Sequence, residues 1–136
     1  MLKGQKGGAW GALLIGTFGL GLIVAGIFPP DPAFGFPPGA PAGPAAMPMS
    51  GHASLHALGF FVSMLSAIIN SFVFVRRFGA LQQRGWVSYC VASGVAAPVL
   101  IVLSILFVSW SGVIVAVAGA VVFGWVSAIA ARVRSE

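Results

Sequence analysis

The sequence predicts an all-α, polytopic membrane protein that folds as a four-helix transmembrane bundle with a Pro/Gly-rich extracytoplasmic loop. Three observations lead to this prediction: 59% of the 136 residues are hydrophobic, only 7% are charged, and the apolar residues gather into four long runs. An average soluble domain has about 25% charged residues, so a soluble fold of this size could not bury so much apolar surface. We therefore expect one transmembrane domain, residues 1–136, in a lipid bilayer.

Each of the four apolar runs is long enough to cross a membrane. A hydrocarbon core of about 30 Å requires about 20 helical residues. The predicted spans are residues 10–28, 55–75, 86–108 and 112–131, and residues 29–50 form the extracytoplasmic loop. The first span is longer than the apolar part of a signal peptide and two prolines follow it, so we expect it to be retained.

The positions of the seven basic residues predict the orientation. They lie before the first span, between the second and third, and after the fourth: Lys3, Lys6, Arg76, Arg77, Arg84, Arg132 and Arg134. The positive-inside rule then places both termini in the cytoplasm, and we expect a multi-pass protein of the cell (inner) membrane. The net charge of +5 does not indicate a nucleic-acid partner, because the charges flank apolar spans instead of forming a surface stripe.

Small residues and tryptophans indicate how the spans pack. A small residue recurs at every fourth position of the last span, at Gly112, Ala116, Ala120, Gly124 and Ala128. This spacing lets another helix approach closely, so we expect a homo-oligomer or a partner membrane protein. The four tryptophans, Trp10, Trp86, Trp110 and Trp125, lie at or near span ends, where interfacial anchors are common.

The second span carries one polar or small stripe. His52, His56, Gly59, Ser63, Ser66 and Asn70 follow helical steps of 4, 3, 4, 3 and 4 residues. Such steps trace one helical face. Because polar groups in hydrocarbon need partners, we expect Ser63, Ser66 and Asn70 to point into the bundle and bond to other helices.

Asp31 lies in the loop, three residues after the first span. Pro30 and Pro32 restrict the backbone on either side of it. His52 and His56 open the next antiparallel helix, so we expect Asp31 within reach of one of them. The loop holds eight of the nine prolines. Its apolar side chains, Phe34, Phe36, Met47 and Met49, suggest a stiff cap lying on the bundle.

The stretch "GLGLIVAGIFPPDPAFGFPPGAP", followed by "SGHASLHALGFF", resembles a family of bacterial and archaeal membrane proteins known as domain of unknown function 998. Its members show a GIFPxDP segment that closes one helix and a histidine pair that opens the next. Members usually have six spans, and this sequence is similar to their last four. The resemblance implies the fold and topology, an absent pair of helices, and no particular activity.

Three hypotheses remain for the function. In the first, the protein is a structural or accessory bundle whose Asp31, His52 and His56 order the loop. In the second, these three residues form an ion, divalent-metal or lipid-headgroup site under the cap. The third is a membrane metal-dependent lipid hydrolase, which is disfavoured because the only other acid, Glu136, lies on the opposite side and no general base remains. We assign no catalytic residue.

Overall fold

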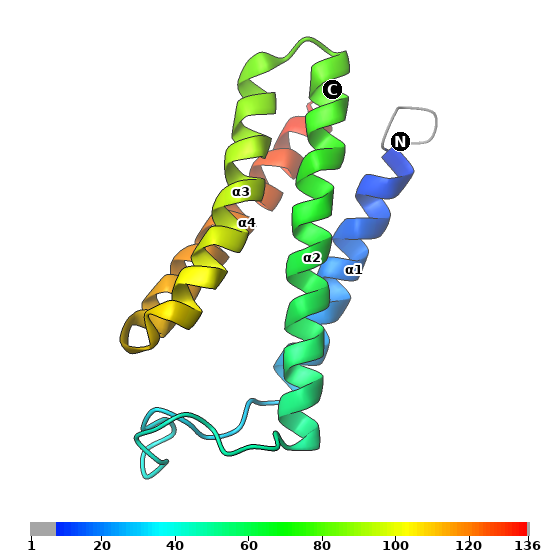
Figure 1. The fold of residues 1–136 in the computed structure, drawn as a ribbon. Coiled ribbons are helices and arrows are strands. Elements are labelled where there is room, and N and C mark those ends of the chain that lie inside the picture. The colour runs from blue at the N-terminus through cyan, green and yellow to red at the C-terminus, as the bar shows by residue number, and fades with distance from the viewer. Residues whose placement is uncertain (1–7, 136) are drawn as a thin grey trace. The chain divides into compact units, whose positions relative to one another are not determined.

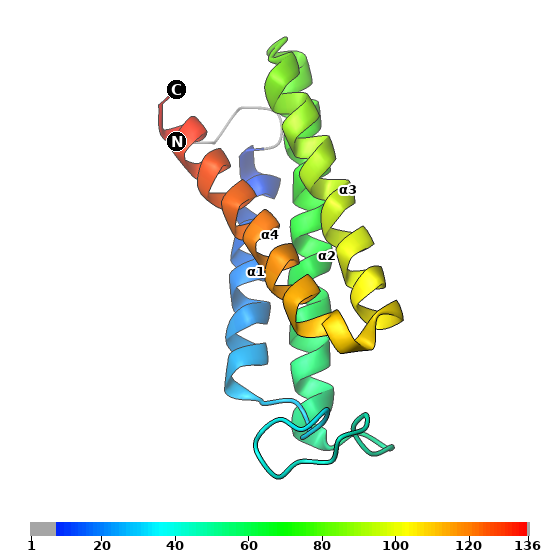
Figure 2. The same cartoon turned by 90° about the vertical axis from the view of Figure 1, so that its left-hand side faces the viewer.

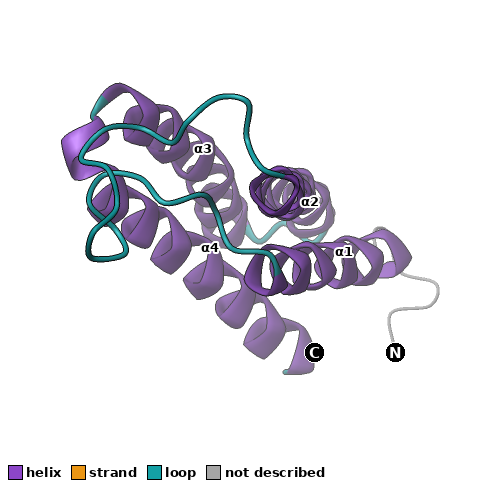
Figure 3. Cartoon of the chain, turned by 90° about the horizontal axis from the view of Figure 1, so that it is seen from below, coloured by secondary structure: helices purple, strands orange, loops and turns teal. Residues whose placement is uncertain are grey.

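The computed structural model describes residues 8–135, and in this part of the chain helices dominate. The elements are α1 (Gly8–Ile27), α2 (Gly51–Ala80), α3 (Arg84–Leu106), the short 3-10 helix η1 (Val108–Trp110) and α4 (Ser111–Arg134) (Figure 1). No strand occurs between residues 8 and 135 (Figure 3). Four helices are long and apolar enough to cross a membrane, which confirms the predicted all-α polytopic fold. Lys3, Lys6 and Glu136 lie outside the described residues.

The helices extend beyond several of the predicted spans. Helix α2 has 30 residues, or about 45 Å of helix, and exceeds a hydrocarbon core of about 30 Å. It begins at Gly51, so His52 and His56 lie in its first two turns. Helix α3 ends at Leu106, two residues before the predicted end of the third span, and α4 begins at Ser111. No glycine or proline lies between residues 107 and 110, so the sequence carries no breaker signal for this turn.

The contacts divide the chain into two compact units, one of which is residues 16–65. In this unit α1 and α2 meet backbone to backbone. A Cβ atom on Gly59 would lie only 2.7 Å from the carbonyl oxygen of Gly21. Near this point the Ser63 hydroxyl donates a hydrogen bond to the carbonyl of Phe18, at 2.9 Å. Glycine therefore sets how closely the two helices approach.

The other unit contains the start of α1, the second half of α2, and all of α3 and α4. Helices α3 and α4 pack against each other on either side of η1 (Figure 2). The apolar core of this unit consists of Phe74, Phe78, Cys90, Trp125 and Ile129. The indole N–H of Trp125 donates to the Cys90 sulfur at 3.4 Å. Trp125 is 1% exposed, so the prediction that it anchors at the membrane interface was wrong.

The predicted small-residue stripe on α4 does not face this core. The buried face of α4 consists of Ala118, Val122, Trp125 and Ile129. Four stripe residues, Gly112, Ala116, Ala120 and Gly124, are exposed, and Ala128 is half-buried. A Cβ atom on Gly112 or Gly124 would meet nothing within 4 Å. The stripe is therefore accessible in this chain, and its packing partner stays a prediction.

Candidate functional site

The end of helix α1 is unusual because prolines remove its last hydrogen-bond donors. In an α-helix the N–H of residue i+4 donates to the carbonyl of residue i. Pro29 and Pro32 stand four residues after Ala25 and Phe28, and proline has no N–H group. The carbonyls of Ala25 and Phe28 therefore cannot be satisfied by the helix itself.

His56 of helix α2 supplies the missing donor. Its Nδ1 atom lies 2.8 Å from the carbonyl oxygen of Ala25 and 3.1 Å from that of Phe28. Because carbonyl oxygens only accept, Nδ1 must carry a proton and donate to both. The side chain also lies at the negative end of the α1 dipole, which favours a donor there. His56 thus replaces two backbone donors that proline removes.

Asp31 makes the corresponding contact at the start of α2. Its Oδ2 atom accepts the backbone N–H of Ser50 at 2.8 Å. The Ser50 hydroxyl oxygen in turn accepts the N–H of Ala53 at 3.1 Å, which makes Ser50 the N-cap of α2. A carboxylate near a helix N-terminus is favoured by the helix dipole. The segment after α1 is therefore fastened to the first turn of α2.

These contacts keep Asp31 ionised. The hydrogen bond from the Ser50 hydroxyl, and after it that from the Ser50 backbone N–H, hold the pKa of the Asp31 carboxyl below its ordinary value of 3.8. Partial desolvation opposes this shift, and the charge of His52 adds to it. The carboxylate form is therefore the one that the junction stabilises at neutral pH.

The three predicted ligands lie at one junction but make separate contacts. The ring of His52 meets the ring of Phe28 edge-on, with the centroids 5.5 Å apart. Among the described residues no hydrogen bond or ion pair joins Asp31 to His52 or His56. Within residues 8–135 no group of three or more His, Cys, Asp or Glu side chains could hold a metal ion. Asp31 and His56 each contact the backbone at a helix end.

The loop between the two helices folds on itself. The N–H groups of Phe34 and Gly35 donate to the carbonyls of Gly43 and Pro41, both at 2.8 Å. Gly35 has a φ of 74°, a left-handed conformation that glycine adopts without strain. The large apolar side chains are exposed, however: Phe34 52%, Phe36 77%, Met47 80% and Met49 45%. They do not pack beneath the loop, as a cap over the helices would require.

The predicted polar stripe of α2 is buried. Ser63, Ser66 and Asn70 are 0%, 5% and 1% exposed. The amide of Asn70 has no hydrogen-bond partner among the described residues. Its Oδ1 atom would lie 3.7 Å from a Cβ atom on Gly11. Asn70 therefore faces the first turns of α1, at a place where only a small residue fits.

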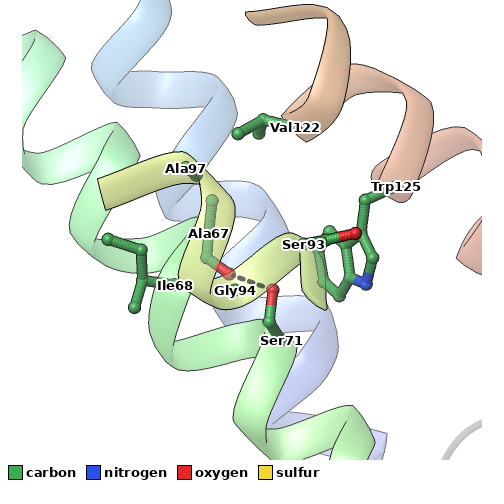
Figure 4. Close-up of a pocket in the computed structure, with 8 residues that line it drawn as sticks. All are labelled: Ala67, Ile68, Ser71, Ser93, Gly94, Ala97, Val122 and Trp125. Carbon is green, nitrogen blue, oxygen red and sulfur yellow. Dashed lines mark hydrogen bonds between the residues drawn. The ribbon is translucent and has the colours of Figure 1, made fainter. Parts of the chain in front are cut away.

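A small, partly open pocket lies between α2, α3 and α4 in the unit that contains residues 66–135 (Figure 4). Its lining consists of Ala67, Ile68, Ser71, Ser93, Gly94, Ala97, Val122 and Trp125. Its volume is about 10 Å³, enough for about one water molecule. The Ser71 hydroxyl already donates to the carbonyl of Ala67 at 3.0 Å. This pocket is too small for a substrate, whereas a shallower pocket of about 350 Å³ on the same unit is lined by Gly85, Trp86, Tyr89 and Ala128.

Sequence reasoning found Asp31 and the histidines, but it missed their partners. The spacing of four residues from Ala25 to Pro29, and again from Phe28 to Pro32, is visible in the sequence. The same spacing separates Gly26 from Pro30, so the sequence signals three carbonyls that need a donor from elsewhere. That signal would have assigned His56 to backbone carbonyls instead of to a carboxylate.

Comparison with known proteins gives one match. A family model described as "Protein of unknown function (DUF998)" matches residues 1–132. No curated protein and no solved structure matches the chain. Since the family model covers nearly the whole sequence, the chain belongs to this family.

Proposed function

We propose that this member of the DUF998 family is a structural or accessory integral membrane protein whose Asp31 and His56 fasten the proline-rich loop to the ends of α1 and α2. One observation carries the proposal: the His56 Nδ1–H donates to the carbonyls of Ala25 and Phe28, which prolines leave without helical donors. The contact joins the end of α1 to the first turns of α2 through groups of the protein itself. It therefore supports an ordering role for the polar residues.

The proposed orientation has both termini in the cytoplasm and the loop outside the inner membrane. The supporting observation is that residues 29–50 contain no lysine or arginine, whereas Arg76 and Arg84 flank the connection from α2 to α3. A cysteine introduced at Ala46 should react with an impermeant maleimide only from outside intact cells. Labelling from the cytoplasmic side alone would reverse the orientation.

A binding site for an ion, a metal or a lipid headgroup is the second candidate, and it has less support. Asp31 Oδ2 and His56 Nδ1 are both engaged in hydrogen bonds to the backbone. A shared ion would have to displace these bonds, and the two helix ends would lose their caps. The capping role explains both side chains with the contacts they already make.

Replacement of His56 tests the ordering role. His56→Ala should lower the free energy of unfolding in detergent by about 1–2 kcal/mol, because two carbonyls lose their donor. The matched control is His52→Ala, which removes an exposed ring that meets Phe28 edge-on and bonds to neither carbonyl. His52→Ala should lower the free energy of unfolding clearly less than His56→Ala does. Equal losses for the two variants would contradict the proposal.

A double-mutant cycle with Pro29→Ala sharpens this test. Alanine at position 29 restores a backbone N–H that can donate to the carbonyl of Ala25. His56→Ala should therefore be less harmful in the Pro29→Ala background than in the natural sequence. If the two effects simply add, His56 does not act as a substitute for the missing donor.

A further inference from the structure

The loop presents large apolar side chains next to the membrane. Phe34, Phe36, Met47 and Met49 are between 45% and 80% exposed. The loop connects Ile27, the last residue of α1, to Gly51, the first residue of α2, and both helices are long and apolar enough to cross a membrane. The loop therefore begins and ends at one membrane surface, whichever side that is. Its exposed side chains have lipid within reach.

The composition of the loop is also compatible with a membrane interface. Residues 32–50 contain no ionisable side chain. Asp31 is the one charge in the loop, and its Oδ2 atom is bonded to the first turn of α2. Moving this segment toward lipid therefore desolvates no unpaired charge. The lack of ionisable side chains thus lowers the cost of placing this loop at the membrane interface.

Proline and internal hydrogen bonds together account for 14 of the 22 backbone positions of the loop, which leaves eight N–H groups free within the described residues. Eight of the 22 residues from Pro29 to Ser50 are prolines, which have no N–H group. Six of the other N–H groups already donate within the protein: those of Ala33, Phe34, Gly35, Phe36, Ala40 and Ser50. Unsatisfied backbone groups are the main obstacle to placing irregular chain near hydrocarbon. Proline and internal hydrogen bonds lower that obstacle here.

We propose that this loop lies in the headgroup–acyl boundary of the adjoining leaflet, with Phe34, Phe36, Met47 and Met49 inserted among the phospholipids. The loop thus acts as an interfacial anchor that is continuous with α1 and α2. This inference rests on the proposed function, because the contacts of Asp31 and His56 hold the loop in one conformation. Aromatic and thioether side chains suit this boundary, where apolar area enters lipid without crossing it.

Spin labelling of the full-length chain tests the depth of the loop. A nitroxide is attached at Ala42→Cys, an exposed loop position, after reconstitution into phosphatidylcholine vesicles. Cys90 is buried and should not react. The label should collide more often with oxygen than with a water-soluble nickel chelate. A label at Gln82→Cys, in the turn between α2 and α3, gives the aqueous reference and should show the opposite preference.

A pair of substitutions then identifies the inserted side chains. Phe36→Ser combined with Met47→Ser should move the Ala42→Cys label toward water and raise its collision rate with nickel several-fold. Ala46→Ser adds a hydroxyl to the same loop and removes no large apolar group, so it should leave the collision rates unchanged. A label that is in water before any substitution would overturn the proposal. A label hidden from both oxygen and nickel would also overturn it, in favour of a protein partner or a second copy.

The line shape of the same spectra separates this inference from the proposed function. An ordered loop gives a broad, immobilised spectrum at Ala42→Cys, and His56→Ala should make that spectrum sharper. If the natural sequence already gives a sharp, mobile spectrum, the ordering role of Asp31 and His56 fails. If the spectrum is immobilised but the label is in water, only the membrane insertion fails.

Discussion

In residues 16–65 the helices meet through hydrogen bonds and a glycine contact, whereas the core of the unit that contains residues 66–135 is built around aromatic rings. In the first unit His56 bonds to two carbonyls, Asp31 bonds to Ser50, and Gly21 meets Gly59. In the second unit the ring of Phe74 lies 6.0 Å from that of Trp125 and 5.8 Å from that of Phe78. Two parts of one small chain thus use different physical means of association.

The difference follows from what each part of the sequence must satisfy. Prolines 29, 30 and 32 leave open carbonyls at the end of α1, so the first unit needs polar partners there. The second unit also has a proline within a helix, Pro98 of α3, but its core is built from large apolar side chains. In a membrane, tight packing and satisfied polar groups replace the hydrophobic drive that holds soluble cores together.

Of the substitutions considered, removal of the Trp125 ring from the core of the second unit should lower the free energy of unfolding most. Trp125→Ala should lower the free energy of unfolding by about 3–5 kcal/mol, because it leaves a large cavity beside Phe74 and Cys90. The measurement is equilibrium unfolding in mixed detergent micelles. Trp110→Ala is the matched control, since Trp110 is 65% exposed. A similar loss for both variants would mean that the aromatic core does not hold this unit together.

A methyl group added at the contact between Gly21 and Gly59 should cause the second-largest loss of stability, in the unit of residues 16–65. A Cβ atom on Gly59 would lie 2.7 Å from the Gly21 carbonyl oxygen and 2.9 Å from the backbone nitrogen of Ala25. Gly59→Ala should therefore push the helices apart and cost about 1–3 kcal/mol. Gly19→Ala, where a Cβ atom would meet nothing within 4 Å, should be neutral or slightly stabilising. Tolerance of Gly59→Ala would contradict the close approach.

Acid should weaken the junction through Asp31, with a smaller effect. The pKa of this carboxyl is lower in the folded protein than its ordinary value of 3.8. Its contribution to stability is therefore complete above that value and is lost as the pH falls through the folded-state pKa. A spin label at Ala42→Cys should keep its line shape from neutral pH down to about pH 4 and become more mobile below it. Asp31→Asn should remove this pH dependence, and its persistence in that variant would assign it to another group.

The sequence predicted the helices well because hydropathy and length determine them directly. In the structure α1 ends at Ile27 and α2 begins at Gly51, on either side of the predicted loop of residues 29–50. Two details could not be predicted, for physical reasons. The end of α3 has no breaker residue, and Trp125 sits near the end of an apolar run whose faces all look alike in composition. Which face is buried depends on neighbouring helices, and one sequence does not encode that choice locally.

The candidate site was predicted in part. The residues at the junction were identified from their types and positions, because acids and histidines are rare in an apolar chain. Their partners were not, because backbone carbonyls and N–H groups occur at every position and carry no signature of their own. The four-residue spacing between a carbonyl and a proline marks Ala25, Gly26 and Phe28 alike, so it does not tell which of the three carbonyls a side chain will reach.

We expect the smallest effect on the free energy of unfolding for substitutions in the small-residue stripe of α4, which lies outside the buried face of that helix. Gly124→Leu should change the free energy of unfolding by less than about 0.5 kcal/mol, because a Cβ atom at this position meets nothing within 4 Å. If two copies pack through the stripe, the same substitution should weaken their association in vesicles, measured by energy transfer between labelled chains. Val117→Leu, which enlarges an exposed side chain of α4 outside the stripe, should leave association unchanged. Energy transfer that is absent in the natural sequence at every protein-to-lipid ratio would mean that the stripe faces lipid or a different protein.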